Sequence, residues 1–280
     1  ILLGAAAVLN EMKDKLHGTV KIVFQPAEEE AAIGGGRHIA ASGKLDDVSE
    51  IYGLHVWPEL PTGKIGLKPG ALMAASDRFY VHIKGKSTHA AQPHNGTDAL
   101  VAAAHFIIDV QSLISREMNP MDNVVCTIGL MNAGTRYNVG VEDAYLEGTC
   151  RTYRPELRDK MEARLGEILQ GLDVMFHTHS ELNYVRGHSA TINTPEKIDF
   201  LKEVGKAYLG EEHIMQPEFP SMCAEDFSSY LEKFPGAFFW LGTGDGNTPA
   251  LHNASFAINE SILPLGITLE AAAALEALSR

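Results

Sequence analysis

The first part of the chain carries a short, dense run of apolar residues. Val20, Ile22, Val23 and Phe24 form the pattern of a buried central strand, which we predict over residues 19–25. Pro26 lacks a backbone N–H and is expected to end this strand. Whatever side chains follow Pro26 would then lie at the carboxyl end of a strand, where α/β sheets commonly bind ligands.

The residues before this strand have a helical pattern instead. Leu2, Leu9, Met12 and Leu16 recur at helical spacing, which predicts an amphipathic helix rather than a signal peptide or a membrane span. No initiator Met precedes this helix. We therefore expect a fragment of a longer protein whose N-terminal part lies outside these 280 residues.

Two more strands are predicted before the pattern changes. Residues 51–57 form an apolar run with His55 near its end, and Pro58 is expected to stop it. Residues 64–67 are a further short strand. The Pro69-Gly70 turn that follows indicates a domain boundary near residue 75.

The middle of the chain alternates between apolar and polar residues. Phe79, Val81 and Ile83 face one side of a half-exposed strand. The elements predicted here are a strand from Asp77, a helix over 96–116, strands over 124–131 and 143–153, a helix over 155–172 and a strand over 174–185. This order of strand, helix, strand, strand, helix and strand is that of a ferredoxin-like domain.

Helices and strands alternate again towards the C-terminus. We predict helices over 196–209, 225–231 and 263–278, and a dense apolar strand over 236–242. The fold class is therefore α/β, with one domain formed by residues 1–75 and 190–280. A smaller α+β domain, residues 76–189, is inserted into it.

Charge and cysteine content exclude some classes of function. The formal net charge of −13 argues against a nucleic-acid partner, which requires a basic surface. The three cysteines, Cys126, Cys150 and Cys223, are too few and too far apart for a disulfide framework or a Cys-x-x-Cys site. A reducing cytoplasm is the expected location, without a membrane partner.

Acidic and imidazole side chains follow the apolar strands. Glu28, Glu29 and Glu30 come directly after the first strand, and His55 and His252 lie near the ends of others. Carboxylate and imidazole groups are suitable ligands for Zn²⁺ or Mn²⁺, and a further carboxylate could act as a general base. Each group also has an interpretation without a metal. The carboxylates could form a solvated turn, His55 could be a hydrogen-bonded core histidine, and His252 could be an ordinary loop residue. The glycines at 34–36 lack the other residues of a phosphate loop, so we interpret them as a backbone bend near the acidic cluster.

Seven motifs then resemble one family in order and spacing. They are Gln25-Pro-Ala-Glu-Glu29, Gly53-Leu-His55-Val-Trp57, His89-Ala-Ala-Gln-Pro-His94, Tyr137-Asn-Val139, Gly148-Thr-Cys-Arg151, Ala224-Glu-Asp-Phe-Ser228 and Leu251-His252-Asn253. The chain resembles the binuclear-metal amidohydrolases, which include hippurate hydrolase, indole-acetyl-amino-acid hydrolase and the aminoacylases. This resemblance covers essentially the whole chain and implies a three-layer, zinc-peptidase-like catalytic domain with a ferredoxin-like lid and dimerisation domain.

The resemblance also implies roles for particular residues. Glu28 would be the general base and acid, and Glu29, His55 and His252 the metal ligands. His89 would reach the active site of a partner subunit and stabilise an oxyanion there.

Other residues receive supporting roles. Asn138 and Arg151 would grip the substrate, although Arg151 suits a structural ion pair equally well. Glu225 and Asp226 would orient the metal ligands, and Glu30 would be a solvated neighbour.

The chain departs from the family pattern in two places. Asn138-Val-Gly-Val-Glu142 stands where the family has Asn-Val-Ile-Pro-Asp, which alters the turn after Asn138. The family also has a Cys-Gly-His-Asp segment upstream of the first helix, and its Cys and His complete a site for two divalent ions. Those two ligands are not among these 280 residues, so the site is expected to be incomplete here.

The expected function is metal-dependent hydrolysis of the amide bond of N-acyl amino acids, by a homodimer that uses two Mn²⁺ or Zn²⁺ ions. Two alternatives remain open. One is a metal-dependent dipeptidase or aminopeptidase, and the other is a catalytically incompetent protein that dimerises or binds through the inserted domain, whose edge strand could pair with a second copy.

Overall fold

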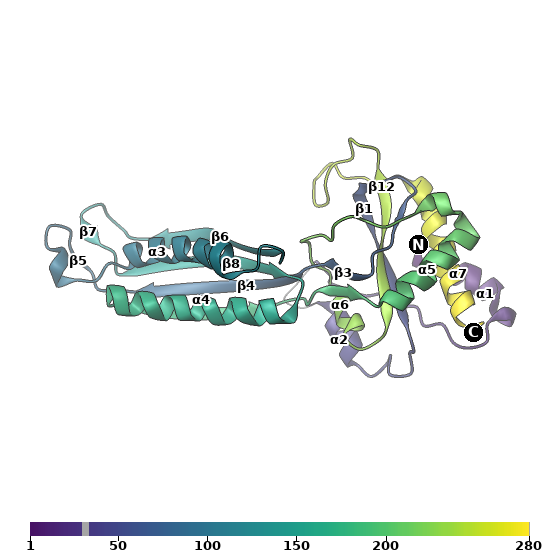
Figure 1. Cartoon of the computed structure of the whole chain (residues 1–280), viewed down its shortest axis with the longest axis horizontal. Helices are drawn as coiled ribbons and strands as arrows, with labels where there is room; N and C mark the ends of the chain where they lie inside the picture. The colour runs from purple at the N-terminus through teal and green to yellow at the C-terminus, as the bar shows by residue number, and fades with distance from the viewer. Residues whose placement is uncertain (30–33, 280) are drawn as a thin grey trace. The chain divides into compact units, whose positions relative to one another are not determined.

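The computed structural model describes residues 1–29 and 34–279 and divides into two compact units. Unit 1 comprises Ile1–Met73, Thr191–Ser221 and Glu225–Arg280, and unit 2 comprises Ala74–Ala190 and Met222–Ala224. Unit 2 is thus an insertion into the chain of unit 1. Figure 1 shows both units with most of their helices and strands labelled.

A four-stranded sheet forms the centre of unit 1. Its order is β1 (Ile51–Pro61), β12 (Gly236–Gly244), β2 (Ile65–Gly66) and β11 (Ile214–Met215). β1 and β12 are parallel, and their regular pairing runs from Ile51 opposite Gly236 to Trp57 opposite Gly242. Every residue of β12 is buried, as expected for a strand that is covered on both faces.

Helices cover both faces of this sheet (Figure 1). One face carries α1 (Leu2–Glu11), α5 (Pro195–Leu209) and α7 (Leu263–Ala277), and the other carries α2 (Gly35–Ala41) and α6 (Ser228–Leu231). Side chains alternate along β12 accordingly: Phe239 and Leu241 pack with α5 and α7, while Phe238 and Trp240 pack on the opposite side. This is the three-layer α/β architecture that the resemblance implied.

Shorter elements complete the two units. Unit 1 also contains a two-stranded sheet of β3 (Gly70–Met73) and β10 (Thr191–Asn193). Single helical turns lie at Lys13–Lys15, Pro93–Asn95, Glu211–His213 and Glu260–Ile262.

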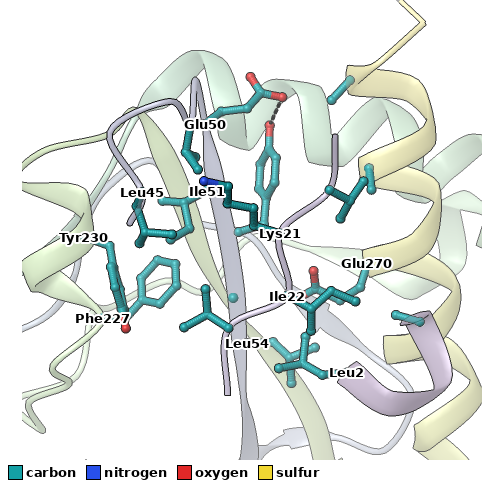
Figure 2. Close-up of a pocket in the computed structure, with 18 of the residues that line it drawn as sticks. Leu2, Lys21, Ile22, Leu45, Glu50, Ile51, Leu54, Phe227, Tyr230 and Glu270 are labelled. Atoms are coloured by element: carbon teal, nitrogen blue, oxygen red, sulfur yellow. Dashed lines mark hydrogen bonds between the residues drawn. The ribbon is translucent and has the colours of Figure 1, made fainter. Parts of the chain in front are cut away.

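The prediction of a central strand at residues 19–25 was wrong. These residues have no regular secondary structure, and Phe24 is 61% exposed. A strand requires a neighbouring strand to pair with, and β1 pairs only with β12 among the described residues. The apolar run instead lines one wall of a cavity of about 790 Å³, whose opposite wall includes residues of β1 (Figure 2).

Two predicted element ends were also wrong. Pro58 lies inside β1, at a shift in register between Trp57 and Pro61, where the strand has a partner on one edge only and tolerates a residue without an N–H. Residues 174–176, predicted as strand, belong to helix α4. That helix ends at His177, whose φ of +57° is left-handed, and β9 begins at His179.

Unit 2 is a four-stranded antiparallel sheet with two helices on one face. The sheet order is β6 (Val124–Ala133), β8 (Asp143–Thr152), β4 (Ala75–Lys84) and β9 (His179–Arg186), and the helices are α3 (Ala99–Ser112) and α4 (Pro155–Phe176). Phe79, Val81 and Ile83 of β4 are fully buried in the core that these helices cover. The chain order β4, α3, β6, β8, α4, β9 confirms the ferredoxin-like prediction.

Helix α3 begins and ends with defined features. The Asp98 side chain caps it by accepting hydrogen bonds from the backbone N–H of Leu100, at 2.9 Å, and of Val101. A π-helical turn, Leu113–Glu117, extends it. By length and composition alone residues 99–117 could cross a membrane, but Phe106 and Val110 are buried in the core of unit 2, as in a core helix of a globular protein.

Asp77 is a buried carboxylate that connects several elements of unit 2. Its two oxygens accept hydrogen bonds from Arg158 Nε at 3.0 and 2.9 Å, from the Tyr184 hydroxyl at 2.9 Å and from the Gly187 N–H at 3.1 Å. Its side chain is 1% exposed. Burial of a charge is costly without such partners, so β4, α4 and β9 must assemble together around it.

We expect Asp77→Ala to destabilise unit 2 by about 3–5 kcal/mol, because it leaves the partly buried Arg158 guanidinium without its counter-charge. Urea unfolding, monitored through hydrogen exchange of the β4 amides, would measure this loss in the free energy of unfolding. Asp122→Ala is the matched control, because it removes the partner of the exposed Arg154 and should cost about 0–1 kcal/mol. Equal losses in the two variants would contradict the assignment.

Candidate metal centre

Two glutamates follow the extended segment of unit 1 after a strained residue. Ala27 has a φ of +60°, which a residue with a Cβ adopts at a cost of order 1–3 kcal/mol. Glu28 follows with a half-buried side chain, while the Glu29 side chain is 75% exposed. The strained bend thus turns two successive carboxylates into different environments. Glu30 lies outside the described residues.

The Glu28 carboxylate belongs to an acidic cluster with two residues far away in the sequence. Glu28, Glu225 and Asp226 each offer one oxygen, and these oxygens lie within 4.8 Å of one another. Glu225 and Asp226 are buried in the loop before α6. This is the only group of three or more such donors within that distance in the part of the chain that the structure describes.

Hydrogen bonds hold Asp226 in this cluster. The Gln25 side-chain amide donates to Asp226 Oδ1, and the backbone N–H of Gly36 donates to Asp226 Oδ2 at 2.8 Å. The role of Gln25 was missed from the sequence, although it opens the Gln-Pro-Ala-Glu-Glu motif. Its position next to Pro26 was the available signal, but only the fold shows that Asp226 lies opposite it.

The glycines at the start of α2 allow the chain to approach this cluster closely. A Cβ on Gly35 would lie 1.9 Å from the Pro26 carbonyl oxygen, and a Cβ on Gly36 would lie 2.6 Å from the carbonyl oxygen of Asp226. Both contacts are sterically impossible for a larger residue without a backbone shift. These glycines therefore serve close backbone packing beside the acidic cluster, which agrees with the interpretation made from the sequence.

Crowding changes the proton affinity of the cluster. Burial, the neighbouring Glu29 and Asp226 together raise the pKa of Glu28 from its usual 4.5 to about 7, although His252 acts in the opposite direction. Burial and the charge of Glu28 likewise raise the pKa of Glu225, whose carboxylate accepts a hydrogen bond from the Phe227 N–H at 3.2 Å. A carboxyl group with a pKa near 7 can both accept and release a proton at neutral pH.

His252 lies beside Glu29. Its Nδ1 is 3.9 Å from Glu29 Oε2, and its side chain is 74% exposed. It occupies the loop that follows β12 and has a φ of +64°. Ala27 and His252 are two of the three described non-glycine residues with positive φ, so backbone strain concentrates on both sides of this pair of donors.

His55 lies on β1, two residues before the regular pairing with β12 ends at Trp57. Its Nδ1 is 2.6 Å from the Val56 carbonyl oxygen, which can only accept a hydrogen bond. Nδ1 therefore carries the proton in the neutral ring, and Nε2 keeps a lone pair that can bind a metal ion. His55 is not part of the acidic cluster, so the structure brings together Glu28, Glu29 and His252 but gives no contact between them and His55.

The remaining predicted site residues lie in unit 2. His89 and Asn138 are neighbours, because β5 (Thr88–His89) pairs with β7 (Val139–Gly140) and the Ala90 N–H donates to the Asn138 carbonyl at 3.1 Å. His89 is exposed, and its Nδ1 accepts from the Ala91 N–H at 3.1 Å.

Arg151 lies on β8 opposite Ser76, and burial lowers its pKa. The described contacts do not pair it with a carboxylate. The roles assigned to these three residues stay predictions.

Unit 1 has a sheet between two layers of helices, and it carries a half-buried Glu28 beside an exposed Glu29–His252 pair. These features are those of the zinc-peptidase-like α/β class. Comparison with known proteins gives the family. The chain matches the peptidase family M20/M25/M40 over residues 1–276, and it therefore belongs to that family.

Two relatives and one solved structure illustrate the match. An N-acetyl-L-cysteine deacetylase from Bacillus subtilis is 36% identical over 262 residues, which cover 94% of this chain and 61% of the relative. An IAA-amino acid hydrolase from Arabidopsis thaliana is 33% identical, over 98% of this chain and 63% of the relative.

The crystal structure of a dinuclear metal binding peptidase of the M20 family from Bacillus subtilis matches with a TM-score of 0.84 and 33% identity. That match covers 99% of this chain and 70% of the other. Judged by the coverage of the two relatives named above, 61% and 63%, the chain spans about three fifths of their length.

The chemical types of the donors suit a divalent metal ion. Glu29 and His252 are exposed donors at 3.9 Å, and His55 has a free Nε2, so carboxylate and imidazole ligands are available. Glu28 is half-buried among carboxylates and holds its proton to higher pH, which suits a base better than a ligand.

The crowding around Glu28 predicts a pH-dependent stability in the metal-free protein. An acid whose pKa is raised on folding keeps its proton in the folded state while the unfolded state releases it, so folding stability falls as pH rises from about 4.5 to about 7. Glu28→Gln cannot titrate, so we expect it to be more stable than the wild type at pH 8 and to differ much less below pH 4.

Melting curves across this pH range, recorded with a chelator present, would measure the difference. Glu232→Gln changes an exposed carboxylate of the same unit and is the control, with no expected gain at pH 8. If Glu28→Gln raised the melting temperature equally at pH 4 and pH 8, the predicted effect of crowding on Glu28 would be wrong.

Proposed function

We propose that the full-length protein hydrolyses the amide bond of N-acyl amino acids in a metal-dependent reaction, to give a carboxylic acid and an amino acid. The observation that carries this proposal is the half-buried Glu28, with its pKa raised to about 7, directly beside the exposed Glu29–His252 pair. A base and metal donors are thus adjacent but in different environments. The names of the relatives, a deacetylase of N-acetyl-L-cysteine and a hydrolase of IAA-amino acids, support this class of substrate.

Glu29, His55 and His252 would hold divalent metal, either Zn²⁺ or Mn²⁺. Bound metal would supply Lewis acidity towards the amide carbonyl and would make water easier to deprotonate. A related structure is described as dinuclear, so we propose two ions here as well. The remaining ligands would come from the Cys and His of the family's upstream segment, outside these 280 residues.

Glu28 would move the proton. With a pKa near 7 its carboxylate takes a proton from the attacking water and then delivers it to the nitrogen of the leaving amine. Asp226 supports this role, because its negative charge close to Glu28 raises the proton affinity of that carboxylate. Gln25 and Gly36 hold Asp226 in place through hydrogen bonds and thus contribute indirectly.

Unit 2 would act as the lid and the dimerisation domain of a homodimer. His89 would stabilise the oxyanion in the active site of a partner subunit, and Asn138, its neighbour in the β5–β7 pair, would contact the substrate. Arg151 would bind the substrate carboxylate, because a guanidinium can donate to both oxygens. None of the three described cysteines forms a disulfide, which suits a cytoplasmic protein.

In the full-length protein loaded with Mn²⁺ or Zn²⁺, we expect Glu28→Gln to lower kcat for N-acetyl amino acids and hippurate by about 10²–10⁴, with little change in KM or metal content, because the variant keeps the shape but loses the proton acceptor. Glu232→Gln is the control and should keep wild-type kcat. Metal analysis of both variants must accompany the kinetics.

Three outcomes would contradict the proposal. Full activity of Glu28→Gln would remove its role as base. Absence of turnover with every acyl amino acid would remove the reaction. A strict requirement for a free α-amine in the substrate would instead indicate a dipeptidase or aminopeptidase.

The role of His89 across a dimer can be tested by mixing two inactive full-length variants. His89→Ala lacks the oxyanion donor and Glu28→Gln lacks the base, so each homodimer should be nearly inactive. If His89 acts on the partner subunit, a mixed dimer holds one site without any substitution and one with both. Random exchange should therefore restore about a quarter of wild-type activity.

A control variant accompanies this measurement. His94→Ala, five residues beyond the end of β5, should behave as wild type before and after mixing. Mixtures that stay inactive although exchange of subunits is demonstrated would show that His89 does not act in trans.

A further inference from the structure

Two of the three cysteines lie opposite each other inside unit 2. Cys126 of β6 and Cys150 of β8 are 24 positions apart in the sequence, but the register of the two strands makes them direct partners. Their Sγ atoms are 3.5 Å apart, and both are free thiols. The third cysteine, Cys223, is exposed. Only the antiparallel pairing of β6 with β8 creates the pair, so the spacing along the chain could not indicate it.

The positions of the two thiols suit a disulfide. Directly opposite residues of an antiparallel pair have Cβ atoms about 4.5–5.5 Å apart, close to the 3.5–4.5 Å or so that a disulfide requires. An S–S bond is about 2.05 Å long, so the two sulfurs would have to approach by about 1.5 Å. Both side chains already lie in the core of unit 2. Small side-chain rotations can therefore close the bond without a change in strand register.

β6 is the strand at one edge of the unit 2 sheet. Among the described residues its only partner strand is β8. The register shifts between Ile128 and Leu130, two residues after Cys126, and this irregularity interrupts the ladder. An edge strand with an interrupted ladder opens locally more readily than a central strand. This part of β6 therefore gives a small molecule a route to the two thiols.

Burial keeps the pair unreactive towards large reagents. Cys126 is 9% exposed and Cys150 is 1% exposed. The hydrogen bond with Cys150, together with burial, raises the pKa of Cys126, so its sulfur stays a protonated thiol at neutral pH. A small, uncharged oxidant can enter when β6 opens, whereas a bulky disulfide or a charged reagent cannot. Hydrogen peroxide is an oxidant of this kind.

We propose that Cys126 and Cys150 form a modification site, which hydrogen peroxide oxidises to a disulfide and small thiols reduce again. The bond ties the edge strand β6 to β8 and closes a loop that contains β7 and Asn138. Disulfides that form in a reducing compartment are typically transient and redox-sensing. The proposal does not depend on the reaction proposed above.

The oxidation balances in two steps. The Cys126 sulfur attacks one oxygen of the peroxide, the O–O bond breaks, and the departing hydroxide takes the thiol proton and becomes water. The Cys150 sulfur then attacks the sulfur of the resulting sulfenic acid. The S–O bond breaks, and the hydroxyl leaves as a second water with the proton of Cys150. Two thiols are thus oxidised to one disulfide, and one peroxide is reduced to two waters.

Peptide mapping of the full-length protein tests the bond directly. The folded protein is treated with excess hydrogen peroxide, its remaining thiols are alkylated in denaturant, and the digest is analysed without reduction. We expect a linked pair of peptides that contain Cys126 and Cys150 and have lost two hydrogens, and dithiothreitol should separate them. Cys126→Ala should abolish this linked pair, whereas Cys223→Ala is the matched control and should keep it.

Several products of the same treatment would overturn the proposal. Cys126 and Cys150 that are both found alkylated would show that the folded protein leaves them reduced. A disulfide from either residue to Cys223 or to another cysteine would assign the wrong partner. Sulfinic acid at either residue in place of the linked pair would show that the second thiol does not react. A linked pair that forms only in denaturant would show that the strand register plays no part.

The melting temperature measures the effect on β6. Closing a loop between residues 24 positions apart reduces the entropy of the unfolded chain, so the oxidised protein should melt on the order of 5 °C higher than the reduced protein. Dithiothreitol should reverse the rise. Cys126→Ala undergoes every other oxidation but cannot close this loop and should show no rise, whereas Cys223→Ala should show the wild-type rise. A linked wild type that melts no higher than the reduced protein would contradict the proposed tie between β6 and β8.

Discussion

The parallel pairing of β1 with β12 is the interaction on which the rest of unit 1 depends. β12 is buried along its whole length, so its apolar side chains must be covered on both faces, and helices from distant parts of the sequence supply that cover. The same pairing aligns the carboxyl ends of the two strands. His55 lies on β1, two residues before its regular pairing with β12 ends, and His252 lies in the loop that follows β12, so a requirement of packing also positions possible metal donors.

The acidic cluster illustrates how burial and chemistry are connected. Three carboxylates within 4.8 Å would repel one another if all were ionised, and their environment decides which one carries the charge. Gln25 and Gly36 donate hydrogen bonds to the two oxygens of Asp226 and hold its carboxylate close to Glu28. Glu28 and Glu225 then retain their protons to higher pH. A residue that only accepts hydrogen bonds thereby adjusts the proton affinity of its neighbour.

Local patterns were sufficient for much of the fold. The alternation at Phe79, Val81 and Ile83 predicted β4, and the order of elements around it predicted the ferredoxin-like unit, because each of these elements has its partners within the chain. The pattern at residues 19–25 is equally apolar, yet these residues form no strand. Hydrophobicity indicates burial, but a strand also requires another strand within hydrogen-bonding distance. The cavity separates residues 19–25 from the edge of β1, and no local pattern contains that information.

The candidate site could be predicted only in part for the same reason. Glu28, Glu29, His55 and His252 follow or end apolar runs, which is a local signal. The approach of Asp226 to Glu28 depends on two segments about 200 residues apart. The raised pKa of Glu28 arises chiefly from burial, then from the charges of Glu29 and Asp226, so it depends on the folded structure. The positive φ of Ala27 and His252 was also invisible in the sequence, because alanine and histidine carry no general preference strong enough to indicate it.

The two-stranded sheet of β3 and β10 has a consequence for how this family can evolve. Met73 pairs with Thr191, so the two points at which the chain leaves and re-enters unit 1 are held side by side by a ladder that belongs to unit 1 alone. An insertion between adjacent ends adds little loop-closure entropy whatever its length. The length of unit 2 is therefore only weakly constrained by the fold of unit 1, and descendants could lengthen or exchange it while the sheet of unit 1 keeps its structure.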